Sequence, residues 1–158
     1  MNMKQQHTPH GFTLLEVMIA LVIFSIGLLG LAGLQARGLQ SNTVAQYRSA
    51  AVILAYDMAD RLRANPAGVA NGDYNNRTTV ASVPTANCVT APCTPAQQAD
   101  YDYYEWTSLA ANQLPSGFGQ VTGNGNQFTI TVMWDENRTG ATTQDCTNLT
   151  CYQLIVEP

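Results

Sequence analysis

The chain begins with a short polar stretch that is followed by a long apolar run. Residues 12–34 are hydrophobic or small almost without interruption, and no charged side chain occurs between residues 17 and 34. A helix that crosses a bilayer needs about 20 mostly apolar residues, so this run is long enough to span a membrane. A secretory signal peptide has a shorter apolar core, which a small-residue cleavage site follows. We therefore expect residues 12–34 to be retained as an anchor.

Beyond residue 34 the apolar pattern becomes that of an amphipathic helix. Between residues 35 and 65, apolar side chains recur at steps of three and four. Asp57 and Arg61 have the spacing of an i, i+4 ion pair, and Asn65-Pro66 is a plausible stop. The pattern predicts one helix from residue 12 to about residue 64, roughly 80 Å long at 1.5 Å per residue. Its amphipathic half presents the stripe Tyr47, Ala51, Leu54, Met58 and Leu62.

Residues 66–158 predict a small globular domain. Gly, Pro, Asn and Thr dominate residues 65–95, which is typical of a long loop. Thr94 and Pro95 then suit the N-cap and first turn of a second helix, which "LPSG" at 114–117 ends. Alternating side chains predict strands near 118–122, 127–134 and 151–157. Strands that follow a long helix favour an antiparallel sheet packed on that helix, an α+β fold.

Composition and charge exclude several functions. The chain has 158 residues, a net charge of -4 and only seven basic residues, which are scattered, so a nucleic-acid-binding face is not expected. No catalytic triad, catalytic Cys/His pair or phosphate-binding loop occurs, so we expect neither an enzyme nor a cofactor. Asp100, Asp102 and Glu105 lack the spacing of an EF-hand. We attribute them to the dipole of the second helix, which favours negative charge near its N-terminus.

All four cysteines lie beyond the apolar run. Cys88 and Cys93 form one C-x4-C pair, and Cys146 and Cys151 form another. Zinc sites usually have shorter C-x2-C knuckles, so disulfides in an oxidising compartment are the better interpretation, and no metal is expected. Of the three connectivities, the local pairing Cys88–Cys93 and Cys146–Cys151 is the simplest. Oxidised cysteines would put the C-terminal part outside the cytoplasm.

Glu16 is a carboxylate at the edge of the apolar run. An ionisable residue costs about 2.5–3.5 kcal/mol at the centre of a span and less near its edge. One interpretation is that Glu16 reaches the membrane interface. The other is that a second chain supplies a positive partner. A cut after Gly11 would create such a partner, because Phe12 would then carry a free ammonium group.

The stretch Gly11-Phe12-Thr13-Leu14-Leu15-Glu16 and the apolar run after it resemble the class III signal of type IV pilins and of type II secretion pseudopilins. The resemblance implies a pilin-like fold and a leader, residues 1–11, that a prepilin peptidase removes. It also implies that Gly11 and Phe12 flank the cleavage site, that Phe12 becomes N-methylated, and that Glu16 is the carboxylate that governs assembly.

Further motifs, "IGLLGLAGLQ", "MADRLRANP", Trp106, "LPSG" and "VMWDE", resemble the PilV-type minor pilins, or type IV pilus modification proteins. The resemblance implies a single-pass inner-membrane protein with a periplasmic domain that later enters the pilus at the cell surface. The implied partners are the major pilin, other minor pilins and the pilus assembly platform. Two alternatives remain: a minor pseudopilin of a type II secretion system, and an adhesive module at a fibre tip. The adhesive surfaces would be the loops at 65–95 and 135–145.

Overall fold

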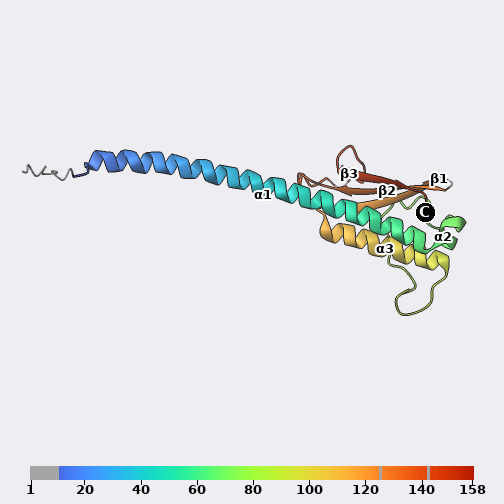
Figure 1. Cartoon of the computed structure of the whole chain (residues 1–158). Coiled ribbons are helices and arrows are strands. Elements are labelled where there is room, and N and C mark those ends of the chain that lie inside the picture. Colours follow the sequence, from blue (N-terminus) through green and yellow to red (C-terminus); the bar gives the residue numbers. More distant parts are fainter. Residues whose placement is uncertain (1–10, 125, 142) are drawn as a thin grey trace, which may run out of the picture. The chain divides into compact units, whose positions relative to one another are not determined.

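A long helix, α1, runs from Leu14 to Ala64 (Figure 1). The computed structural model describes residues 11–124, 126–141 and 143–158. They divide into two units, and the boundary between Asn42 and Thr43 lies within α1. In the first unit every described side chain is exposed, and the helix surface is apolar on nearly all sides. Among the described residues, α1 is the one helix that is long and apolar enough to cross a membrane.

The second unit contains a three-stranded antiparallel sheet. The strands are β1 (Phe118–Asn124), β2 (Gln127–Trp134) and β3 (Thr150–Val156), in the order β1-β2-β3. Asn124 pairs with Gln127, so the connection between β1 and β2 is a tight turn. The sequence therefore predicted the fold class correctly, because a long helix packs on a small antiparallel sheet.

The core of this unit joins α1, the sheet and a second helix, α3 (Pro95–Gln113). Trp106 of α3 is fully buried, and its indole Nε1 donates a hydrogen bond to the backbone oxygen of Leu54 in α1, at 2.7 Å. Its ring also lies against Gly119, where an added Cβ would come within 2.3 Å of the indole. A larger residue at position 119 would therefore displace the tryptophan. The remaining core residues include members of the predicted α1 stripe and residues of α3 and β2: Ala51, Met58, Leu62, Tyr103, Ala110, Phe128, Ile130, Val132 and Trp134.

Local signals explain where the helices begin. Thr94 caps α3, and its hydroxyl oxygen accepts a hydrogen bond from the backbone N–H of Gln97 at 3.3 Å. The Gln97 side chain accepts one in return from the N–H of Thr94 at 3.0 Å, which completes a capping box. Pro66 ends α1 as expected, but it also starts a short helix, α2 (Pro66–Asn71). The prediction of an unbroken loop over residues 65–95 was wrong here, because proline also favours the first position of a helix.

The face of the sheet that is turned away from α1 is more buried than simple alternation of apolar and polar residues suggests. Met133 is fully buried and forms a small second cluster with Phe118 and Leu149. Leu149 comes from the connection between β2 and β3, which therefore covers this face. The alternating pattern in β2 does not indicate this burial, because it marks only the face turned toward α1.

Candidate assembly segment

The start of α1 is organised by a threonine cap. The backbone oxygen of Thr13 accepts hydrogen bonds from the N–H groups of Glu16, at 3.1 Å, and Val17, at 3.3 Å. The Thr13 hydroxyl oxygen also accepts from the N–H of Glu16, at 3.3 Å. Thr13 and Glu16 thus occupy the first and last positions of the S/T-x-x-E capping pattern. Our sequence analysis missed this role of Thr13, although the pattern itself is a recognisable signal.

The carboxylate of Glu16 is exposed in the first turn of α1. Among the described residues it has no ion-pair or hydrogen-bond partner. The N-terminal end of a helix carries partial positive charge, which favours a carboxylate there by about 0.3–1 kcal/mol. That interaction leaves the carboxylate oxygens free to bind a donor from outside the chain. Phe12, one helical turn earlier, is 83% exposed. Most of the expected leader, residues 1–10, lies outside the described residues.

The apolar run contains only one other polar side chain besides those at its start. The hydroxyl of Ser25 donates to the backbone oxygen of Leu21 at 2.7 Å, so it is satisfied within the helix. Glu16 is the only charged residue between Phe12 and Arg37. A helix that is apolar all round is stable only in lipid or inside a protein assembly. In either environment Glu16 is the group that most needs a partner.

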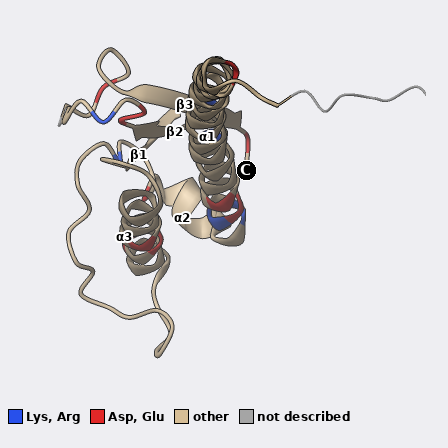
Figure 2. Cartoon of the chain, turned by 90° about the vertical axis from the view of Figure 1, so that its left-hand side faces the viewer, with Lys and Arg blue, Asp and Glu red and all other residues tan. Residues whose placement is uncertain are grey.

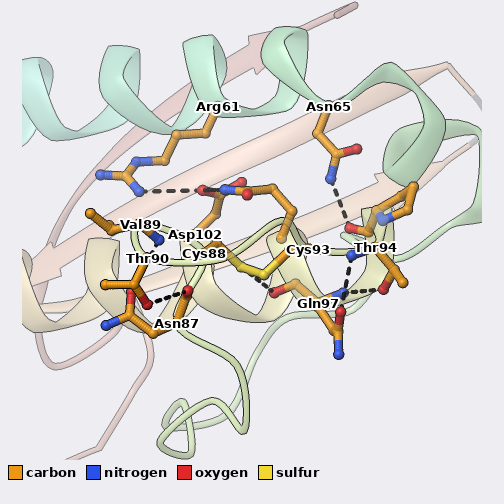
Figure 3. The surroundings of a disulfide bond; sticks show 12 residues. Arg61, Asn65, Asn87, Cys88, Val89, Thr90, Cys93, Thr94, Gln97 and Asp102 are labelled. Carbon is orange, nitrogen blue, oxygen red and sulfur yellow. Dashed lines mark hydrogen bonds and ion pairs between the residues drawn. A yellow bond between two sulfur atoms is a disulfide. The ribbon is translucent and has the colours of Figure 1, made fainter.

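The four cysteines form two disulfides, and none is free. Cys88 is bonded to Cys93, with an S–S distance of 2.03 Å, and Cys146 is bonded to Cys151, at 2.09 Å. This is the local pairing among the three connectivities, and it leaves no thiolate for a four-cysteine zinc site. Figure 3 shows the Cys88–Cys93 bond beside the start of α3, where Cys93 directly precedes the cap residue Thr94. The disulfide therefore fixes the end of the long loop against a helix terminus.

The acidic residues of α3 form ion pairs with two arginines. The guanidinium of Arg61, near the end of α1, lies 2.7 Å from Glu105, 3.0 Å from Asp57 and 3.5 Å from Asp102. Asp100 pairs with Arg77 at 2.7 Å. No acidic residue occupies the first turn of α3. Our explanation of these residues by the helix dipole was therefore wrong, because they are too far along the helix and serve as arginine partners.

Burial and charge oppose each other at Arg61. Burial alone would lower the pKa of Arg61, but hydrogen bonds and charge interactions with Glu105 and Asp57 outweigh it, so the pKa is raised. Figure 2 shows acidic and basic residues close together at this end of α1. The arrangement ties α1 to α3.

The chain matches two models of known protein families. Residues 8–32 match the model of the prokaryotic N-terminal methylation motif, and residues 33–104 match a family model described as type IV pilin Tt1218. No curated protein and no solved structure matches the chain significantly.

The start of α1 is apolar, exposed and capped by Thr13, and the second half of α1 packs on a small antiparallel sheet, which together form a pilin-like α+β fold. With the two matches, this fold shows that the chain belongs to the type IV pilin family and carries its class III N-terminal signal. Type IV pilins are structural proteins rather than enzymes. The class III signal implies processing by a prepilin peptidase.

Proposed function

We propose that this type IV pilin is a minor pilin of the PilV type, which helps to initiate or modify the pilus fibre. Residues 12–34 would anchor the precursor in the inner membrane. Residues 35–65 would extend the helix, and the domain at 66–158 would lie in the periplasm until the subunit enters the fibre. The motifs "MADRLRANP" and "VMWDE" support the PilV-type assignment. In the first of them, Arg61 makes the ion pairs that hold α1 to α3.

The assembly role in this proposal rests on the carboxylate of Glu16, which lies at the start of an exposed apolar helix and has no partner in the part of the chain that the structure describes. In lipid this charge has a cost, which the chain's own terminus offsets only in part. Among packed subunits it gains the Phe12 ammonium of a neighbour, and the attraction is stronger in a medium of low dielectric constant. The charge therefore favours the fibre over the membrane.

The ammonium exists only after cleavage between Gly11 and Phe12. Mass spectrometry of the mature protein from an intact strain should give a chain that begins at Phe12 and carries one added methyl group. The same chain from a strain that lacks prepilin peptidase serves as the control, and it should retain residues 1–11. A mature chain from the intact strain that still begins at Met1 would contradict the proposed processing.

Abundance in the fibre and the effect of deleting the chain distinguish a minor pilin from a pseudopilin and from an adhesive module at the fibre tip. Quantitative immunoblotting of sheared pili should find far fewer copies of this chain than of the major pilin, and deletion of the chain should reduce the number of pili. Loss of protein secretion with normal pili would instead identify a pseudopilin. Normal pili that have lost adhesion would identify a fibre-tip module that uses the loops at 65–95 and 135–145.

A further inference from the structure

The outer edge of β3 is an unprotected edge of the sheet. β3 pairs with β2 without a break in register, from Thr150 opposite Trp134 to Val156 opposite Phe128. The strand contains no charged residue and no proline. Sheet edges in natural proteins are usually blocked by charges, prolines, bulges or a covering segment, because an open edge recruits other strands. Within the described residues, β3 has none of these protections.

The residues that face outward can be identified from the pairing. On β1, Val121 exchanges two backbone hydrogen bonds with Arg77, at 2.8 and 2.9 Å, so its backbone groups point away from β2. Val121 lies opposite Ile130, whose backbone groups therefore point toward β3 and bond to Leu154. Because the direction of the backbone groups alternates along a strand, the N–H and C=O groups of Cys151, Gln153 and Ile155 point to the open side of β3. These groups have no backbone partner in the described part of the chain. The side chain of Ile155 is also 61% exposed.

The opposite edge of the sheet is closed. Arg77 covers β1 at Val121, and the hydroxyl of Tyr103 donates to the backbone oxygen of Gly119 at 3.0 Å. The same hydroxyl lies 2.8 Å from the backbone oxygen of Thr79, so its one hydrogen is shared between the two oxygens, and the chain after Arg77 lies beside β1. The two edges therefore differ, since one is covered by the chain itself and the other is open.

The chain beside β1 has the properties of a strand donor. We call Val80–Pro84 the valine segment. Val80 and Val83 are 71% and 75% exposed, and no charged residue occurs between positions 78 and 94. No backbone hydrogen bond involves the valine segment within the described residues. Exposed β-branched side chains and unpaired backbone groups are what a partner for an open edge supplies.

We infer that the β3 edge of one copy binds the valine segment of a second copy by β-augmentation. The choice of occupant rests on the proposed membrane anchoring. An antiparallel β3–β3 contact would need a two-fold axis normal to the sheet, and that axis reverses the direction of the α1 half packed on the sheet. The N-terminal ends of this α1 half, to which the anchor segment is joined, would then point in opposite directions in the two copies. A contact between opposite edges can keep both copies in the same orientation, and repeated contacts of this kind build an open filament where the rotation between copies does not close a ring.

The test identifies the occupant directly. Ile155 is replaced by the photo-reactive amino acid p-benzoylphenylalanine in the full chain, and light and ¹⁵N-labelled copies are mixed in detergent micelles before irradiation. Mass spectrometry should find cross-links between light and heavy chains that join position 155 to residues 78–84. The matched control places the same amino acid at Ile53 of α1, which is 67% exposed and should not reach this segment.

Variants of the donor segment make the test specific. The double substitution Val80→Lys and Val83→Lys should abolish the cross-link from position 155, whereas Val89→Lys, at a residue that is 76% exposed, should leave its yield unchanged. Cross-links to β3 of the second copy, to another protein alone, or only within one chain would overturn the inference. So would an undiminished cross-link in the double variant. Processing at Phe12 is measured separately, so failure here leaves the proposed pilin function intact.

Discussion

At the residue scale, Asp102 connects three segments through its two carboxylate oxygens. One oxygen accepts a hydrogen bond from the Tyr74 hydroxyl at 2.6 Å, and the other accepts from Gln98 at 2.8 Å and lies 3.5 Å from Arg61. Tyr74 in turn accepts from the side-chain amide of Asn65, at 3.1 Å. Asp102 and Tyr74 are both buried. A buried carboxylate that loses a donor keeps its desolvation cost, so each of these bonds matters to stability.

Tyr74→Phe should therefore lower the free energy of unfolding by about 1–3 kcal/mol, because it leaves Asp102 and Asn65 without one partner each. Denaturant titration of the full chain in micelles, followed by tryptophan fluorescence, measures the change. Tyr56→Phe is the control, since Tyr56 is 53% exposed and should change stability by less than about 0.5 kcal/mol. Equal effects of the two substitutions would contradict the role of this network.

The buried phenols should also resist ionisation. Burial raises the pKa of Tyr103 to about 12, and burial with the hydrogen bond to Asp102 raises that of Tyr74 further. Because the folded pKa lies above the unfolded value of about 10, the stabilisation is complete below pH ~10 and is lost as the pH rises through about 12. At pH ~11 the folded chain should absorb less at 295 nm than the unfolded chain. Tyr103→Phe should reduce this difference, and an unchanged difference would contradict the assignment.

The sequence predicted single-residue contacts only where they are local. The spacing of Asp57 and Arg61 identified their ion pair, which the structure confirms at 3.0 Å. It could not identify the pairs of Arg61 with Asp102 and Glu105, because they join residues more than 40 positions apart on different helices. Such contacts depend on how the helices pack, and periodicity within one helix does not determine that.

At the element scale, each disulfide closes a short loop beside a regular element. Cys93 precedes α3, and Cys151 lies in β3, where it packs against the small cluster of Phe118, Met133 and Leu149. The two loops have the same sequence separation of 5 residues, so the chain-entropy account gives each bond about 2 kcal/mol. They differ in packing. Cys88, Cys93 and Cys151 are all half-buried, but only Cys151 packs against an apolar core cluster.

Replacing both Cys146 and Cys151 by serine should therefore destabilise the domain more than replacing Cys88 and Cys93. We expect a loss of about 2 kcal/mol for the Cys88/Cys93 variant. The loss for the Cys146/Cys151 variant should be larger, because a serine hydroxyl packs less well in the apolar cluster. Denaturant titration compares the two variants with the intact chain. A smaller loss for the Cys146/Cys151 variant would contradict this account of packing.

The elements themselves were largely predictable. Apolar periodicity, Thr94-Pro95 and strand alternation identified α1, α3 and the three strands to within a few residues. The short helix α2 was missed because one proline both ends α1 and begins α2. The difference between the two sheet edges was also beyond the sequence, because it depends on the distant contact of Arg77 with Val121.

At the scale of the whole molecule, the chain contains an exposed apolar helix and a well-packed globular unit. The globular unit has a buried core and two disulfides. The first unit is different, because its apolar side chains and its one carboxylate are all exposed. This contrast is what a subunit needs if it resides in a membrane and later enters a fibre. In the proposed account, Glu16 determines the balance between these two states.

The fibre content of Glu16 variants tests this account most directly. Glu16→Gln keeps a residue that suits the capping pattern with Thr13 but removes the charge, whereas Glu16→Asp keeps the charge. At equal expression, both variants should insert in the membrane. Immunoblots of sheared pili should show at least a tenfold loss of the Gln variant, while the Asp variant should retain a measurable share. If the Gln variant enters pili as well as the unmodified chain does, Glu16 only rests at the membrane interface and the proposed assembly role is wrong.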